Sequence, residues 1–308
     1  MKRSIHHTKG HGRAGLLFCM PNLAGFVLFT LFPVAASLVL AFTDWKMLSW
    51  PPRFVGLDNF VNLLGFRRGP EGWVARDPLF WQYLYNTVFL MLGIPLSMAA
   101  SLLLALALNR VVRGVAVIRA VFFTPSLCMG VAIFMVWRML YHADVGLINQ
   151  VLAWFNVHGP DWLNSMRWSK PALIFMTVWL QAGGYNMVLY LAGLQGIPPE
   201  LYEAARVDGA GRFAQLRHVT WPMLAPTTFF IFIMSVISGF QGGFEAAYIM
   251  TRGGPAGTTT TLSYYIYNTA YTGELQLGYG SAIAWVLLIL VFVITLVNWR
   301  FGGRAVTG

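Results

Sequence analysis

The sequence predicts an all-α membrane protein with six transmembrane helices. Of its 308 residues, 57% are hydrophobic and only 10% are charged, and the mean hydropathy is +0.61. Soluble domains carry about 25% charged residues. Six stretches lack Asp, Glu, Lys and Arg, and each approaches or exceeds the roughly 20 residues that a membrane-spanning helix needs. These stretches are 14–43, 83–109, 120–137, 171–199, 219–244 and 275–299.

The first span follows a basic tail, residues 1–13, that contains Lys2, Arg3, Lys9 and Arg13. A signal peptide has an apolar core of about 7–15 residues. The uncharged run here is 30 residues long, so it is expected to remain as a span. We therefore divide the chain into a tail at 1–13, a six-span domain at 14–299 and a second tail at 300–308.

The segment 44–82, between the first two spans, is long and rich in aromatic residues. Its G-L-D-N-F-V-N-L-L portion predicts a short amphipathic helix over 58–64, with Asp58 as the N-cap. The third run, 120–137, is marginal in length. We expect it to include Arg119 and Arg138, whose long side chains can reach the membrane surface.

The distribution of Lys and Arg predicts that both termini are cytoplasmic. With that orientation, the inner segments 1–13, 110–119, 200–218 and 300–308 hold 12 of the 21 basic residues but only three of the 11 acidic ones. Cytoplasmic loops of membrane proteins carry an excess of Lys and Arg. The polar segment 200–218, between the fourth and fifth spans, is then cytoplasmic.

Segment 200–218 itself predicts a helical elbow. Pro198 and Pro199 suit the first turn of a helix, because proline lacks an N–H that would be unpaired there anyway. Gly209 and Gly211 are expected to end this first helix. A second short helix is predicted through Phe213 and Val219 to Pro222.

The same stretch resembles a known motif. Glu203-Ala204-Ala205, then Asp208-Gly209-Ala210 and finally Pro222 are similar to the EAA loop of permease subunits of binding-protein-dependent ABC importers. The fuller Y-E-A-A-x-x-D-G-A pattern resembles the carbohydrate branch, of the maltose and glycerol-phosphate type. R-A-V-F-F-T-P at the third span, G-L-I-N at 146–149, T-R-G-G-P at 251–255 and L-G-Y-G-S-A-I-A-W at 277–285 extend the resemblance over nearly the whole chain. Trp221 and Leu216 depart from residues common in the family.

The resemblance implies a role and a set of partners. The chain would be the permease of an ATP-driven importer in a bacterial cytoplasmic membrane, for a sugar or a related polyol or glycerol phosphate. It would form the translocation path with a second permease, and two ATPase subunits and an extracytoplasmic binding protein would complete the complex. Residues 203–205, 208 and 209 would couple the permease to the ATPase. No cofactor is expected in this chain, because the ATPase would use ATP and magnesium. No catalytic residue is expected either.

Polar residues within the spans predict where a solute passes. Such residues are costly in a membrane and so are candidates for function. The fourth span contains Gln181, Tyr185 and Asn186, and the fifth contains Ser235 and Ser238. Gln181 and Tyr185 are four residues apart, and the serines three, so each pair can share a helix face. Packing between helices would explain the same residues equally well.

Other classes of function are disfavoured. The basic residues form no nucleic-acid-binding pattern, and Cys19 and Cys128 both lie in apolar runs, where neither a disulfide nor a metal site is expected. The main alternative is a secondary transporter driven by an ion gradient. It would need ionisable groups at the middle of the membrane, and the six uncharged runs contain none.

Overall fold

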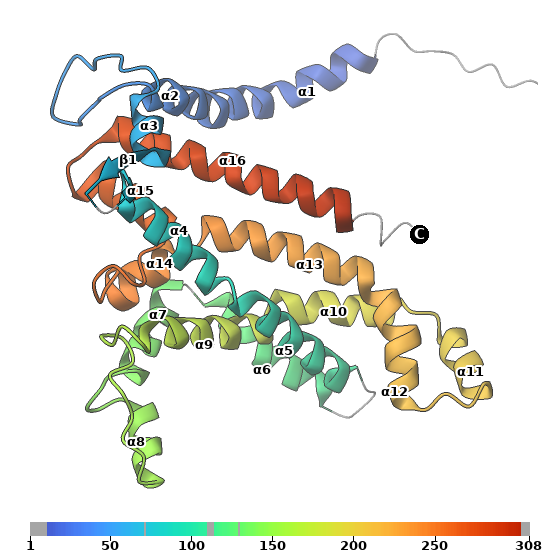
Figure 1. Cartoon of the computed structure of the whole chain (residues 1–308). Helices are drawn as coiled ribbons and strands as arrows, with labels where there is room; N and C mark the ends of the chain where they lie inside the picture. The colour runs from blue at the N-terminus through green and yellow to red at the C-terminus, as the bar shows by residue number, and fades with distance from the viewer. Residues whose placement is uncertain (1–10, 71, 110–113, 129, 303–308) are drawn as a thin grey trace, which may run out of the picture.

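The computed structural model describes residues 11–70, 72–109, 114–128 and 130–302. Long helices run alongside one another between two ends of the molecule (Figure 1). The first half contains α1 (His11–Phe26), the π-helical turn η1 (Val27–Leu31), α2 (Phe32–Ala41), α3 (Asp58–Leu64), β1 (Phe66–Gly69), β2 (Gly72–Ala75), α4 (Pro78–Leu90), α5 (Gly93–Leu108), α6 (Val115–Leu127), α7 (Gly130–Leu140) and α8 (Leu147–Trp154). The second half contains α9 (Ser169–Ala182), α10 (Tyr185–Gln195), α11 (Pro199–Val207), α12 (Arg212–Gln215), η2 (Leu216–Thr220), α13 (Trp221–Gln241), α14 (Phe244–Ala246), η3 (Ala247–Thr251), α15 (Leu262–Tyr267), η4 (Asn268–Thr272) and α16 (Leu277–Gly302).

Four helical segments are long and apolar enough to cross a membrane, namely Leu17–Ala41, Pro78–Leu108, Arg212–Gln241 and Leu277–Arg300. They overlap the first, second, fifth and sixth predicted runs. The third and fourth runs correspond to two bent pairs, α6 with α7 at 98° and α9 with α10 at 41°. The described part of the chain thus contains four candidate spans, or six if each bent pair crosses once.

Proline and glycine explain the two bends. Helix α6 contains Pro125 and ends two residues later at Leu127, after which Cys128 adopts an extended conformation. Gly183 and Gly184 separate α9 from α10. A Cβ atom on Gly183 would collide with the carbonyl oxygen of Phe122 in α6. Glycine at 183 therefore allows α6 to approach the bend between α9 and α10 closely.

Helices α5, α10, α13 and α16 enclose the main hydrophobic core, which includes Met98, Met187, Tyr190, Leu224, Ile231 and Ile283. Buried serines join α5 to α9. The hydroxyl of Ser97 donates to the side-chain oxygen of Gln181 at 2.9 Å, and that of Ser101 donates to the Gln181 main-chain oxygen at 3.1 Å. These bonds satisfy polar groups that would be costly to bury unpaired.

The N-terminal helix lies apart from this core. The apolar window within Leu17–Ala41 has no buried residues, although α2 packs along α16 and the Trp285 indole donates to the Ser37 hydroxyl at 3.2 Å. Figure 1 shows α1 diverging from α16. This helix leaves its apolar surface for lipid or another protein.

The end of the molecule that carries α15 is a compact polar cap. Strands β1 and β2 form an antiparallel hairpin, a small exception to the predicted all-α class. The short helix spans Asp58–Leu64 as predicted, but Leu57 is its N-cap and Asp58 is already its first residue. The prediction that Asp58 is the N-cap of this helix was therefore wrong, although a carboxylate in the first turn still suits the helix dipole.

A loop from Gly253 to Thr261 is held against α4 in this cap. The Asn86 amide donates to the carbonyl oxygens of Gly257 at 2.8 Å and Thr260 at 3.0 Å. The Asp77 carboxylate caps α4 and accepts hydrogen bonds from the phenols of Tyr265 and Tyr279, each at 2.7 Å. Burial raises the pKa of Tyr265, so its phenol remains a donor to Asp77. The T-R-G-G-P element is bonded to the same loop, because the hydroxyls of Thr259 and Thr260 donate to the carbonyl oxygens of Gly254 and Gly253.

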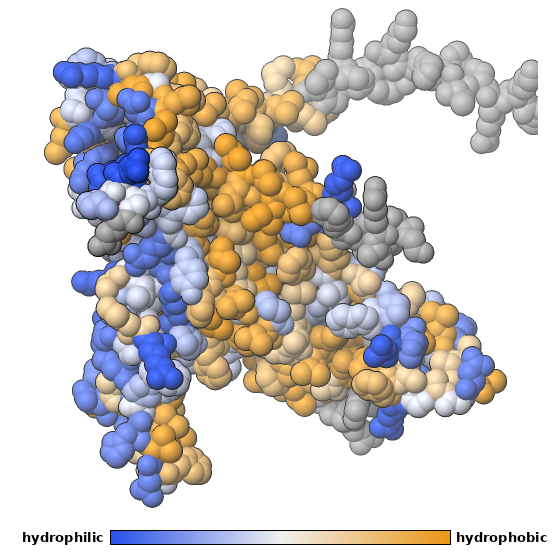
Figure 2. All heavy atoms as spheres, in the orientation of Figure 1, coloured by the Kyte–Doolittle hydropathy of each residue, from blue (hydrophilic) through white to orange (hydrophobic). Residues whose placement is uncertain are grey.

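Apolar atoms occupy the middle of the molecule in Figure 2, and polar atoms gather at its two ends. One polar end carries α14, α15 and the hairpin, and the other carries α11 and α12. The start of α1 and the end of α16 point toward the α11–α12 end. This pattern is typical of a protein whose middle lies in a bilayer.

Candidate functional site

Helix α11 and the turn after it form the first part of the predicted elbow. Pro199 is the first residue of α11, and the helix ends at Val207. Gly209 then adopts a left-handed conformation, with φ +78°. Its N–H bonds to the Arg206 carbonyl at 3.1 Å, and the Ala210 N–H bonds to the Ala205 carbonyl at 2.8 Å. These two bonds form a Schellman motif, in which glycine is strongly favoured at the left-handed position.

The second part of the elbow differs from the prediction. Instead of a separate short helix ending at Pro222, α12 continues through η2 into α13, giving one helix from Arg212 to Gln241. The wider π-helical turn at Leu216–Thr220 precedes Pro222, whose ring would clash with the carbonyl of an ordinary helical turn. The elbow is therefore the direct continuation of a long helix.

Two hydrogen bonds hold α11 and the turn after it to the base of this long helix. The Tyr202 hydroxyl lies 3.0 Å from the Thr220 hydroxyl. The Gln215 amide donates to the Ala210 carbonyl at 2.9 Å. Thr220 is buried, so the first bond is shielded from water and fixes the angle between α11 and α13.

The outer surface of the elbow is exposed and mixed in character. Val207 is 88% exposed and Phe213 is 75% exposed. Four of the five predicted coupling residues, Glu203, Ala204, Asp208 and Gly209, are also exposed, and Ala205 is half-buried. Exposed apolar side chains surrounded by charges mark a surface suited to a protein partner.

A second candidate site is a cavity of about 510 Å³ among α4, α5, α9, α13 and α14. Three of the five predicted path residues, Gln181, Ser235 and Ser238, line it together. The Gln181 side-chain oxygen already accepts a hydrogen bond from Ser97, so its two amide N–H donors and the second lone pair of that oxygen are what it can offer a ligand. The cavity wall combines these polar groups with apolar side chains such as Met91 and Phe134.

The other two predicted path residues lie elsewhere. Tyr185 begins α10, beyond the Gly183–Gly184 break, so it does not share a continuous helix face with Gln181. Its side chain is 69% exposed and meets the Phe123 ring edge-on, with 5.9 Å between the ring centres. Neither Tyr185 nor Asn186 lines the cavity.

Some cavity residues were not predicted as site residues. Thr177 lies one turn before Gln181 on α9, and that four-residue spacing was a usable signal. Thr87 and Thr261 come from α4 and the distant loop before α15, so only the tertiary fold brings them here. Glu245 also lines the cavity and follows the end of the fifth uncharged run.

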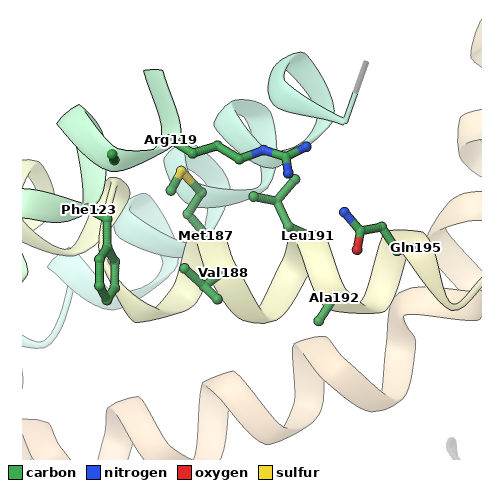
Figure 3. A pocket seen from close by; sticks show the side chains of 8 residues that line it. Arg119, Phe123, Met187, Val188, Leu191, Ala192 and Gln195 are labelled. Atoms are coloured by element: carbon green, nitrogen blue, oxygen red, sulfur yellow. The ribbon is translucent and has the colours of Figure 1, made fainter. Parts of the chain in front are cut away.

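A smaller groove lies between α6 and α10 (Figure 3). Arg119 extends over Leu191 in the direction of Gln195, and one of its terminal nitrogens donates to the Leu108 carbonyl at 2.6 Å. Leu108 ends α5, and a cation suits a helix C-terminus. Arg119 therefore caps α5. We predicted that the third span includes Arg119 and Arg138, and these residues lie in α6 and α7 respectively.

Comparison with known proteins identifies the family. The profile of the binding-protein-dependent transport system inner membrane component family matches residues 15–301. The chain is 36% identical over 305 residues to the probable ABC transporter permease protein YesP of Bacillus subtilis, covering 97% of this chain and 93% of that protein. It is 34% identical to the lactose transport system permease protein LacF of Rhizobium radiobacter, covering 92% of each.

A solved structure has the same fold. A subunit of a bacterial ABC transporter that imports the acidic polysaccharide alginate superposes with a TM-score of 0.81, over 97% of this chain and 99% of that one, at 24% identity. The family is one of transport components, not enzymes, and its members are multi-pass membrane proteins. The chain belongs to the family of binding-protein-dependent transport system inner membrane components, as the permease subunit of an importer.

Proposed function

We propose that this permease carries a carbohydrate through the cavity among α4, α5, α9, α13 and α14. Relatives that are 34% and 30% identical are named for the transport of lactose and diacetylchitobiose. A sugar presents hydroxyl groups around a less polar ring. The amide of Gln181 and the hydroxyls of Ser235 and Ser238 can hydrogen-bond to the sugar hydroxyls. Met91 and Phe134 can pack against the less polar ring. Tyr185 and Asn186 would meet the solute only on another part of its path.

The proposed topology has six spans, with both termini and the elbow in the cytoplasm. The four long segments would supply four crossings, and each of the two bent pairs, if it crosses once, would add another. The start of α1 and the end of α16 point to the same end as α11 and α12 (Figure 1), which supports the orientation that Lys and Arg counts predict. Residues 1–10 and 303–308 of the two predicted tails lie outside the described residues.

The proposed partners are a second permease, two ATPase subunits and an extracytoplasmic solute-binding protein, in a bacterial cytoplasmic membrane. The related alginate transporter was solved with a pentasaccharide-bound periplasmic protein. The ATPase would use ATP and magnesium, and this chain would hold no cofactor. Family membership favours this ATP-driven mechanism over the ion-gradient alternative.

One observation carries the proposed mechanism: a single helix joins the elbow to the cavity. Thr220, at the base of α13, bonds to Tyr202 of the elbow, and Ser235 and Ser238 lie near the other end of α13. At 1.5 Å per residue, Thr220 and Ser238 are about 27 Å apart along the helix. An ATPase that moves the elbow through residues 203–205, 208 and 209 would thus move the cavity wall as one rigid element.

The test is to purify the complex through a tag on this chain, with Glu203→Lys beside the wild type. Wild-type chain is expected to recover an ATPase and a second permease, with ATP hydrolysis stimulated by the loaded binding protein. Glu203→Lys reverses a charge on the exposed elbow, so it should insert normally but lose the ATPase. Arg167→Glu, a charge reversal at the opposite end, is the matched control. Normal ATPase recovery with Glu203→Lys would contradict the coupling role of the elbow.

A further inference from the structure

Helix α8 stands on an arm that projects from the end of the molecule opposite the elbow (Figure 1). Leu147, Val151 and Trp154 of this helix and its C-cap residue Phe155 occur at the i, i+4, i+7 and i+8 positions, so they lie on one face. All four side chains are exposed, Trp154 by 79% and Phe155 by 74%. The helix therefore presents an unpartnered apolar stripe, which we call the α8 stripe.

The arm is held in shape by polar contacts on its other side. The Asn149 side chain accepts a hydrogen bond from the Trp162 indole at 2.6 Å and donates to the carbonyl oxygens of Ala143 at 2.8 Å and Pro160 at 3.2 Å. The Gln150 amide donates to the Val145 carbonyl at 3.1 Å. The stripe is thus preformed, and does not need a partner in order to fold.

The direction of the stripe indicates what covers it. On the arm, apolar atoms gather on the side turned toward the α11–α12 end, and polar atoms on the opposite side (Figure 2). The apolar side of the arm is therefore turned toward the apolar middle of the molecule, which is the part that lies in the membrane. Trp and Phe are the residues that such interfacial helices place in the boundary between headgroups and acyl chains.

From this geometry we infer that α8 is an interfacial helix, whose stripe lies in the lipid leaflet on the side opposite the elbow. It would fix the height of this end of the permease in the bilayer and keep the 143–168 segment against the membrane surface. The stripe has no charged residue, so an apolar lipid contact, and not a specific headgroup, would hold it. The inference depends on the membrane placement alone, so it stands or falls separately from the solute and the ATPase coupling.

The test places one fluorescent label on each side of α8. In a Cys19→Ser, Cys128→Ser background, Val151→Cys lies on the stripe, and Ala153→Cys is exposed on the opposite side, next to Asn149 and Asn156 around a polar hollow. The purified complex, labelled with an environment-sensitive dye, is placed in nanodiscs whose lipids carry a nitroxide near the headgroup. Quenching at position 151 is expected to be severalfold stronger than at 153. A water-soluble paramagnetic quencher should give the reverse order.

Leu147→Cys provides a second label on the stripe, in case the change at Val151 disturbs the arm. Equal lipid quenching on the two sides of α8 would overturn the inference. It would also be overturned if labels at 147 and 151 were protected from both quenchers and cross-linked to the second permease, because a protein would then cover the stripe.

Discussion

Gly209 shows how one residue shapes the elbow. An L-residue with a side chain pays about 1–2 kcal/mol in the left-handed conformation that Gly209 adopts at φ +78°. Gly209→Ala is therefore expected to weaken the turn after α11 and to lower ATP hydrolysis stimulated by the binding protein. Gly209→Pro should be worse, because proline cannot adopt this φ and also removes the N–H that bonds to Arg206.

Gly211 supplies the matched control for Gly209. Its backbone is extended, at φ −68° and ψ 171°, and a Cβ there would meet open space. Gly211→Ala should leave coupling unchanged, since alanine adopts that conformation without strain. Equal loss in both alanine variants would mean that the left-handed turn is not what the glycine provides.

Variants at Ser238 and Tyr185 distinguish a solute path through the cavity from one along the exposed face of α6 and α10. Loss of one hydrogen bond from Ser238→Ala costs about 0.5–1.5 kcal/mol, so uptake of radiolabelled sugar into proteoliposomes should fall roughly two- to tenfold. Tyr185→Phe removes a hydroxyl that lies outside the cavity and should have little effect on uptake. The reverse result would place the path along the exposed face of α6 and α10 instead.

At the scale of elements, the bond between Tyr202 and Thr220 joins α11 to α13. Tyr202→Phe and Thr220→Val each remove it, while the exposed face of the elbow stays intact. Both variants should retain the ATPase and hydrolyse ATP, but transport less sugar per ATP. The two changes break the same contact, so their effects should be less than additive in a double-mutant cycle. Strict additivity would show that the bond does not transmit the movement.

Helix positions were predictable where charge or composition marks the boundary. The uncharged runs located the four long segments, and the amphipathic pattern placed α3 at 58–64, although Asp58 is its first residue and not its N-cap. The bends were not predictable from hydropathy, because Pro125 and the Gly183–Gly184 pair lie inside runs that read as continuous. The role of Gly183 depends on contact with Phe122, some 60 residues away, and single-sequence patterns do not show such contacts.

The candidate site residues divide in the same way, into those with a local sequence signal and those that only distant contacts bring together. The elbow has a local signal in its prolines, charges and glycines, so its position was predictable. Ser235 and Ser238 share a face because α13 is unbroken, as their spacing predicted. Gln181 and Tyr185 were expected to share one too, but the Gly183–Gly184 break separates them. Thr87 of α4 and Thr261 meet at the cavity because the loop before α15 packs on α4, and this tertiary contact has no local signal.

The whole molecule has an elbow at one end, a polar frame at the other and a long helix between them (Figure 1). This arrangement assigns different tasks to the two ends. The frame around Asp77 and Asn86 is internally bonded and is suited to remain rigid, whereas the elbow exposes Val207 and Phe213, which the proposed ATPase partner would cover. The unburied N-terminal helix adds a surface that a lone chain leaves uncovered, as expected of one subunit in a larger assembly.

The two ends must lie on opposite sides of the membrane for this arrangement to work, and cysteine labelling of intact cells tests it. In the background lacking Cys19 and Cys128, Ala204→Cys lies on the exposed elbow and Asp144→Cys is exposed between α7 and α8. A membrane-impermeant maleimide should label position 144 in intact cells, and position 204 only after permeabilisation. The reverse pattern would place the elbow outside, where no cytoplasmic ATPase could reach it, and would contradict the coupling mechanism while leaving the fold intact.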